Sequence, residues 1–222
     1  MAVGVKTLNG VVGISYKNKT PKSILEISKE QGYQTALIAT SSIVHATPAS
    51  FYAHVDSRRK YQEIALQLST GVVDYFIGGG ENHFNKRKDK RNLLEEMTSY
   101  AFVDDFEEFK DSSSKKIGFL TYPGEPPPKN LGREPSLEML TEVSLRKLSK
   151  DKSFFIMIEG SQIDWGGHDN SLSYILSEFK EFDLAIGKAL EFAKADGNTL
   201  VIVTADHETG GMALSGGNVK RS

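Results

Sequence analysis

Residues 154–168 read FFIMIEGSQIDWGGH, an apolar run followed directly by carboxylate and imidazole side chains. The run Phe154–Ile158 has the length and composition of a buried β-strand. Side chains just past the carboxyl end of a parallel strand face the ligand crevice of an open α/β sheet, so Glu159 is expected there. Asp164 and His168 are four residues apart, and a helical turn would project both from one face toward one ion. Taken alone, such a pair more often caps a helix or makes a surface contact.

Apolar runs with strand character alternate with segments of helical spacing along the chain. Besides Phe154–Ile158, strands are expected at Tyr33–Ala39, Tyr75–Ile77, Lys116–Leu120 and Thr199–Val203. Helices are expected at Ile24–Ile27, Tyr61–Leu68, Leu137–Leu148 and Leu172–Ala193. The alternation predicts a three-layer α/β sandwich, in which helices flank a mostly parallel central sheet. At 222 residues, the chain fits a single catalytic-type α/β domain over residues 1–222.

The composition limits the classes of function. A net charge of −2 provides no basic field for a nucleic-acid backbone, so no nucleic-acid partner is expected. No apolar run approaches the roughly 20 residues of a membrane helix, so no membrane span is expected. Because the chain has no cysteine, thiolate zinc sites and cysteine nucleophiles are excluded, and a metal would be bound by His, Asp, Glu or Thr.

A second cluster of acidic and imidazole groups follows a second strand-like run. Residues 199–211 read TLVIVTADHETGG, in which Asp206 and His207 come soon after the apolar stretch. In isolation, Asp206 is equally well explained as the cap of the next turn and His207 as a loop histidine. Two such clusters in a chain without thiols favour zinc held by nitrogen and oxygen ligands.

A third segment of interest, residues 45–54, reads HATPASFYAH and follows the strand expected at Tyr33–Ala39. Thr47 before Pro48 is typical of a helix N-cap with proline at the first helical position, and this structural role alone explains both residues. Arg58 is more often a surface residue in such a position. Its planar and permanently charged guanidinium is nevertheless the group that best matches phosphate oxygens.

Three segments resemble the alkaline phosphatase family: residues 45–54, 158–168 and 203–211, which occur in the family's order and are spread over most of the chain. Residues 4–10 are similar to the stretch that follows the family's nucleophile region. The resemblance implies the family's α/β sandwich, with phosphate monoesters and inorganic phosphate as ligands. It also implies a periplasmic or extracellular location and a homodimer as a candidate assembly.

The resemblance implies two zinc ions and one magnesium ion as cofactors. Six positions match their ligands: Asp164 and His168 for the first zinc, Asp206 and His207 for the second zinc, and Glu159 and Thr47 for magnesium. The first zinc would activate water and stabilise the leaving oxygen, and the second would lie beside the nucleophilic serine.

Three further positions match the phosphate pocket of the family. Arg58 matches the arginine that binds two phosphate oxygens. His45 lies near the magnesium shell, where some members have Asp and others His. Trp165 replaces a Lys or His of other members and would line the pocket.

The sequence also departs from the family pattern. The family's serine nucleophile and a bridging aspartate lie upstream of residues 4–10, a further zinc-binding histidine lies near its C-terminus, and none of the three is present. No other serine is nominated as the catalytic residue. We therefore expect a chain truncated at both ends, with weakened metal occupancy and no activity, whereas the full-length phosphate monoester hydrolase would form a phosphoserine intermediate.

Two alternatives stay open. One is another hydrolase of the same superfamily that acts on phosphodiesters or sulfate esters, or a phosphoglycerate mutase. The pair Thr47 and Glu159 argues against it, because the resemblance links this pair to monoesterases. The other is a non-catalytic module that binds metal or phosphate, which the missing serine supports.

Overall fold

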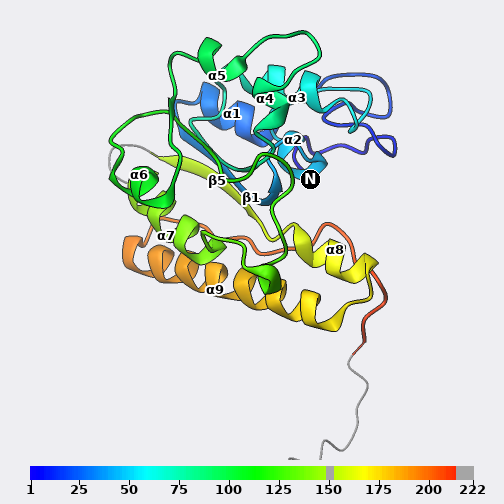
Figure 1. Cartoon of the computed structure of the whole chain (residues 1–222), viewed down its shortest axis with the longest axis vertical. Coiled ribbons are helices and arrows are strands. Elements are labelled where there is room, and N and C mark those ends of the chain that lie inside the picture. Colours follow the sequence, from blue (N-terminus) through cyan, green and yellow to red (C-terminus); the bar gives the residue numbers. More distant parts are fainter. Residues whose placement is uncertain (149–152, 214–222) are drawn as a thin grey trace, which may run out of the picture.

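The computed structural model describes residues 1–148 and 153–213. Its centre is a parallel sheet with the strand order β3-β4-β2-β1-β5 (Figure 1). The strands are β1 (Gln34–Ser42), β2 (Tyr75–Gly79), β3 (Ala101–Phe102), β4 (Ile117–Leu120) and β5 (Phe154–Glu159). Four of the five expected strands and the parallel sheet are therefore confirmed.

Helices cover both faces of the sheet because its strands are apolar on both sides. The chain places α1 (Ile24–Glu30), α3 (Tyr61–Leu68), α4 (Asn82–Asn85) and α5 (Leu93–Glu96) on one face, and α6 (Phe106–Asp111), α7 (Leu137–Leu148) and α9 (Leu172–Asp196) on the other (Figure 1). Leu37 packs into the first core, whereas its neighbours Ala36 and Ile38 pack into the second, as the two-residue period of a strand requires. The three-layer α/β sandwich is thus confirmed.

The carboxyl ends of β1 and β5 lie side by side at one edge of the sheet. Ala39 of β1 is in register with Glu159 of β5. Two short helices start beyond these ends, α2 (Ala46–Ala49) after β1 and α8 (Gln162–His168) after β5. All segments with expected site residues, apart from residues 199–211, therefore leave the sheet at this edge.

The strand expected at Thr199–Val203 is not formed, so this prediction was wrong. The segment is extended without ladder partners among the described residues, and Leu200 and Ile202 are 82% and 76% exposed. A strand exists through hydrogen bonds to a neighbour, and apolar composition cannot supply that neighbour.

The four expected helices are confirmed, with small shifts at their ends. The sequence pattern missed β3 and the helices α4, α5 and α6, which have two to six residues each. Elements of this length contain too few positions to show a periodic pattern. In the described parts of the chain, every helix is too short or too polar to cross a membrane.

Candidate metal and phosphate site

Glu159 ends β5 at the centre of the candidate site. Its carboxylate accepts a hydrogen bond of 2.6 Å from the Ser161 hydroxyl and a second one from the Thr47 side chain. Gly160 leaves little room for a side chain, because a Cβ there would lie 3.0 Å from the ring of Phe182 on α9. The chain therefore turns tightly out of β5 and starts α8 directly beside the end of the strand.

Thr47 lies inside α2, so the expectation that it caps the helix was wrong. His45 occupies the N-cap position, and its side chain makes no capping hydrogen bond. The Thr47 hydroxyl is consequently available to Glu159. This contact joins the segment after β1 to the end of β5.

Helix α8 presents Asp164 and His168 on successive turns, with His168 Nε2 3.5 Å from Asp164 Oδ1. The segment after α9 packs against this helix. The Thr209 hydroxyl donates to Asp164 Oδ1, and His207 Nδ1 lies 4.0 Å from the same oxygen. The two clusters that are 40 residues apart in the sequence are therefore adjacent in space.

A close backbone approach holds the second cluster on α8. A Cβ at Gly167 would lie 2.7 Å from the carbonyl oxygen of Thr209, and one at Gly210 would lie 2.4 Å from that of Gly167. Beyond the contact, the Asp206 carboxylate lies 3.4 Å from His207 Nε2. Small residues on both segments thus allow the imidazole of His207 to approach Asp164.

His45, Arg58 and Trp165 form the part of the site that has no carboxylate. The ring of Trp165 packs edge-to-face on the imidazole of His45, with ring centroids 5.7 Å apart. His45 Nε2 lies 3.2 Å from the exposed guanidinium of Arg58, and its buried Nδ1 has no hydrogen-bond partner. The guanidinium is therefore fixed at one nitrogen and open to solvent elsewhere.

The electrostatics of the site favour a cation. Burial, aided by the charges of Asp206 and Asp164, raises the pKa of Glu159 to about 7, against the lowering effect of the two hydrogen bonds it accepts. Burial and the neighbouring Arg58 lower the pKa of His45 to about 4, so its imidazole is neutral at pH 7. Carboxylates that repel one another and imidazole nitrogens nearby are ligand types suited to zinc or magnesium.

The donors do not yet enclose an ion. Within residues 1–148 and 153–213, no group of three or more His, Asp or Glu side chains converges on a metal position. The separations of 3.5 Å and 4.0 Å at Asp164 join ligand atoms to each other, and two atoms that each lie about 2 Å from a tetrahedral zinc ion are about 3.3 Å apart. The chemistry of the donors therefore fits the implied metals, and the spacing of Asp164 and His168 is close to that of two ligands of one zinc ion.

Sequence reasoning missed Ser161, Gln162 and Thr209, which bond within or beside the site. Ser161 lies two residues after Glu159, and Thr209 two after His207, so both belong to segments already singled out. The hydrogen bond of Thr209 joins residues 45 positions apart, and no local pattern contains such a contact.

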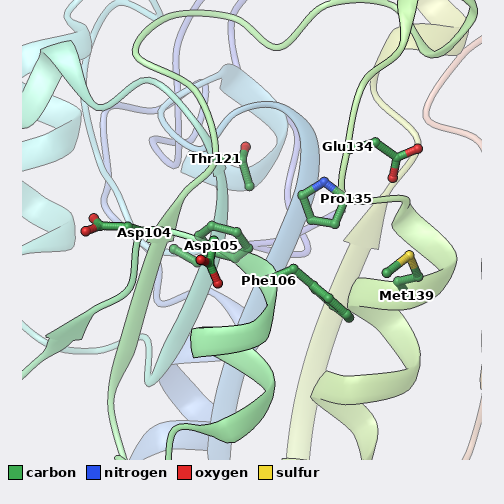
Figure 2. A pocket seen from close by; sticks show the side chains of 8 residues that line it. Asp104, Asp105, Phe106, Thr121, Glu134, Pro135 and Met139 are labelled. Carbon is green, nitrogen blue, oxygen red and sulfur yellow. The ribbon is translucent and has the colours of Figure 1, made fainter.

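A separate pocket lies at the carboxyl end of β4, and none of the expected site residues lines it (Figure 2). It has a volume of about 310 Å³, with Phe106, Phe119 and Met139 as apolar lining and Asp104, Asp105 and Glu134 as acidic lining. The carboxylates would repel a phosphate group, so this pocket is not the phosphate site.

A parallel α/β sandwich with carboxylates and imidazoles gathered beyond its strand ends belongs to the class of α/β proteins that bind their ligands at this edge of the sheet. The family model described as alkaline phosphatase matches residues 1–221. This chain belongs to the alkaline phosphatase family.

Individual relatives agree with this assignment. The chain is 42% identical to alkaline phosphatase 3 of Bacillus subtilis over 96% of its own length, and 30% identical to the Escherichia coli enzyme over 93%. The crystal structure of alkaline phosphatase from the Antarctic bacterium TAB5 is 46% identical and superposes with a TM-score of 0.90, covering 94% of this chain and 63% of that one. The chain spans about half the length of the curated relatives it matches.

Proposed function

We propose that this chain supplies the metal-binding and phosphate-binding part of a phosphate monoester hydrolase that uses two zinc ions and one magnesium ion. The observation that carries the proposal is the contact between residues 158–168 and 203–211, made by Asp164 with Thr209 and His207. Family membership supports the reaction class. The proposal covers the full-length enzyme, including a phosphoserine intermediate on a serine outside this sequence.

In this proposal, each metal is bound by one pair of residues. Asp164 and His168 would bind the first zinc, Asp206 and His207 the second zinc, and Glu159 and Thr47 magnesium. When bound, these ions supply Lewis-acid stabilisation of the attacking and leaving oxygens. A variant of the TAB5 enzyme, with a histidine replaced by glutamate, is described with magnesium bound in its M3 site.

The chain's own residues would bind and orient the phosphate. Arg58 offers a planar fork to two phosphate oxygens, and the contact with His45 Nε2 holds one of its nitrogens in place. Because the pKa of His45 is lowered to about 4, its imidazole stays neutral and adds no repulsion to the guanidinium. Trp165 packs on His45 and would exclude water from that side.

We also propose that residues 1–222 alone have no turnover. Ser161, which lies beside Glu159, is 6% exposed and donates its hydroxyl to that carboxylate, so it is not presented as a nucleophile. The same observation supports the second candidate, a non-catalytic module that binds metal or phosphate.

Two measurements test these proposals. Titration calorimetry with Zn²⁺ should show binding to the wild-type chain and weaker binding to Asp164→Asn. Hydrolysis of p-nitrophenyl phosphate with added Zn²⁺ and Mg²⁺ should stay at the blank rate. An absence of Zn²⁺ binding would contradict the metal site, whereas turnover comparable to full-length relatives would contradict the lack of activity. Hydrolysis of bis-p-nitrophenyl phosphate instead would favour a phosphodiesterase.

A further inference from the structure

Gln162, the first residue of α8, is fully buried and joins three separate parts of the chain. Its Nε2 donates to the carbonyl oxygen of Thr40 at 2.7 Å and to that of Pro126 at 2.9 Å. Its Oε1 accepts a hydrogen bond of 2.6 Å from the hydroxyl of Tyr174 on α9. Both amide hydrogens and the amide oxygen of this side chain are therefore satisfied.

These partners surround the candidate metal site. Thr40 belongs to β1, shortly before His45 and Thr47, and Gln162 lies two residues before Asp164. The amide of Gln162 thus connects the segment of the expected magnesium ligand Thr47 with the helix of the expected zinc ligand Asp164. Among the described residues, no other side chain of α8 makes a hydrogen bond to β1.

Tyr174 is itself anchored, because α9 is fixed to the loop that carries Pro126. Arg133 in that loop makes a hydrogen-bonded ion pair with Glu178 of α9 at 2.5 Å and a second one with Glu181, and all three side chains are at most 4% exposed. Arg133 also donates to the carbonyl oxygen of Pro127. A buried and paired cluster of charges is rigid. It therefore holds Tyr174 and Pro126 in position for their hydrogen bonds with Gln162.

We propose that Gln162 and Tyr174 are positioning residues of the metal site. They set the start of α8 against β1 so that Asp164 and His168 face the end of β5. The inference rests on the proposed metal-binding function. Replacing Gln162 by leucine would leave the Tyr174 hydroxyl and two carbonyl groups buried without partners, and α8 would shift to satisfy them. Partners that hydrogen-bond directly to metal ligands change metal affinity by about 10- to 100-fold when removed, and Gln162, which hydrogen-bonds to none of the proposed ligands directly, is expected at the lower end, about 10-fold.

The experiment compares Gln162→Leu, Tyr174→Phe and the double variant with the wild-type chain. Zn²⁺ affinity is measured by titration calorimetry with the metal alone, and Co²⁺ absorption in the visible range reports ligand geometry. Gln162→Leu should weaken Zn²⁺ binding by about 10-fold and alter the Co²⁺ spectrum. Tyr174→Phe should have a smaller effect, and the double variant should be no worse than Gln162→Leu because both remove one network.

Thr141→Val is the matched control. Thr141 is fully buried on α7, and its hydroxyl has no hydrogen-bond partner. This variant should leave Zn²⁺ affinity and the Co²⁺ spectrum unchanged, whatever it does to thermal unfolding. A Gln162→Leu variant that folds and binds Zn²⁺ like the wild type would overturn the proposal. If that variant does not fold, wild-type affinity and spectrum in Tyr174→Phe would overturn it, whereas a failure of the wild type itself to bind Zn²⁺ would overturn the proposed function.

Discussion

Residues 154–168 and 199–211 share one sequence pattern and have different structures. Each has an apolar run of strand length followed by acidic and imidazole side chains. The first run forms β5, because all five of its residues, and Glu159 after them, are in register with β1. The second run has no ladder partner among the described residues, and Val203 is 53% exposed. The pattern therefore indicates the capacity to form a strand, and an available neighbour determines whether the strand forms.

Unlike the two apolar runs, which differ in structure, the polar ends of the two regions lie in the same place. Although one follows a strand and the other an extended segment, both bring their acid and imidazole to the same place, where Thr209 bonds to Asp164. Contact through Gly167 and Gly210, rather than sheet pairing, brings them together. Each prediction below tests one side of this comparison.

The largest effect is expected for the strand that pairs with β5. Ile38 of β1 is fully buried and contributes to the core beneath β5. Ile38→Ala should lower the free energy of unfolding by about 2–5 kcal/mol, since it removes buried methylene groups and leaves a cavity. Urea denaturation followed by circular dichroism measures this. A loss below about 1 kcal/mol would show that the side chains of β1 do not pack in the core that β1 and β5 share.

The second-largest effect is expected in how the free energy of unfolding depends on pH, because the charge of Asp206 in the second region acts on Glu159 in the first. The pKa of Glu159 is raised from 4.5 to about 7, so the folded protein holds a proton that the unfolded chain releases. The preference of the folded protein for this proton contributes to its free energy of unfolding. The contribution is fully present below pH 4.5 and is lost as the pH rises through about 7. It amounts to at most about 3 kcal/mol.

The measurement is urea denaturation without metal at several pH values, for the wild type and Glu159→Gln. The wild type should lose stability relative to the variant between pH 4.5 and 7. Parallel pH profiles of the two proteins would contradict the raised pKa and the crowding of Glu159 by Asp164 and Asp206.

A smaller effect is expected at the contact between the regions. Gly167→Ala places a Cβ 2.7 Å from the Thr209 carbonyl oxygen and should push residues 206–211 away from α8. The free energy of unfolding should fall by about 1 kcal/mol, while Zn²⁺ affinity measured by calorimetry falls clearly. Gly187→Ala on α9 is the control, because a Cβ there meets nothing within 4 Å and should leave Zn²⁺ binding unchanged. Equal Zn²⁺ affinity in both variants would show that the contact plays no part in the site.

The smallest effect is expected in the unpaired run. Leu200→Ala removes a side chain that is 82% exposed, so the free energy of unfolding should change by less than about 0.5 kcal/mol. The same urea experiment as for Ile38→Ala measures it. A loss of 2 kcal/mol or more, in the range of about 2–5 kcal/mol for buried leucines, would mean that this run is packed in solution.

The sequence predicted most of the sheet and the long helices, because strong apolar periodicity and length accompany β1, β2, β4, β5 and α9. It failed at Thr199–Val203, where pairing decides the outcome, and at the short elements α4 to α6. For the site, the residues beyond β5 could be chosen from their place after a strand. The hydrogen bonds of Gln162 to Thr40 and of Thr209 to Asp164 could not, since they join residues 122 and 45 positions apart.

The adjacency of residues 158–168 and 203–211 in one two-zinc centre is tested most directly by NMR of the histidine imidazoles during a Zn²⁺ titration of the wild-type chain. The imidazole signals of both His168 and His207 should shift by the time two equivalents of Zn²⁺ are added, whereas those of His54 and His83, which lie outside the candidate site, should stay in place. A shift of His168 without any response of His207 at excess Zn²⁺ would show that the two segments do not form one metal centre, and would contradict the account.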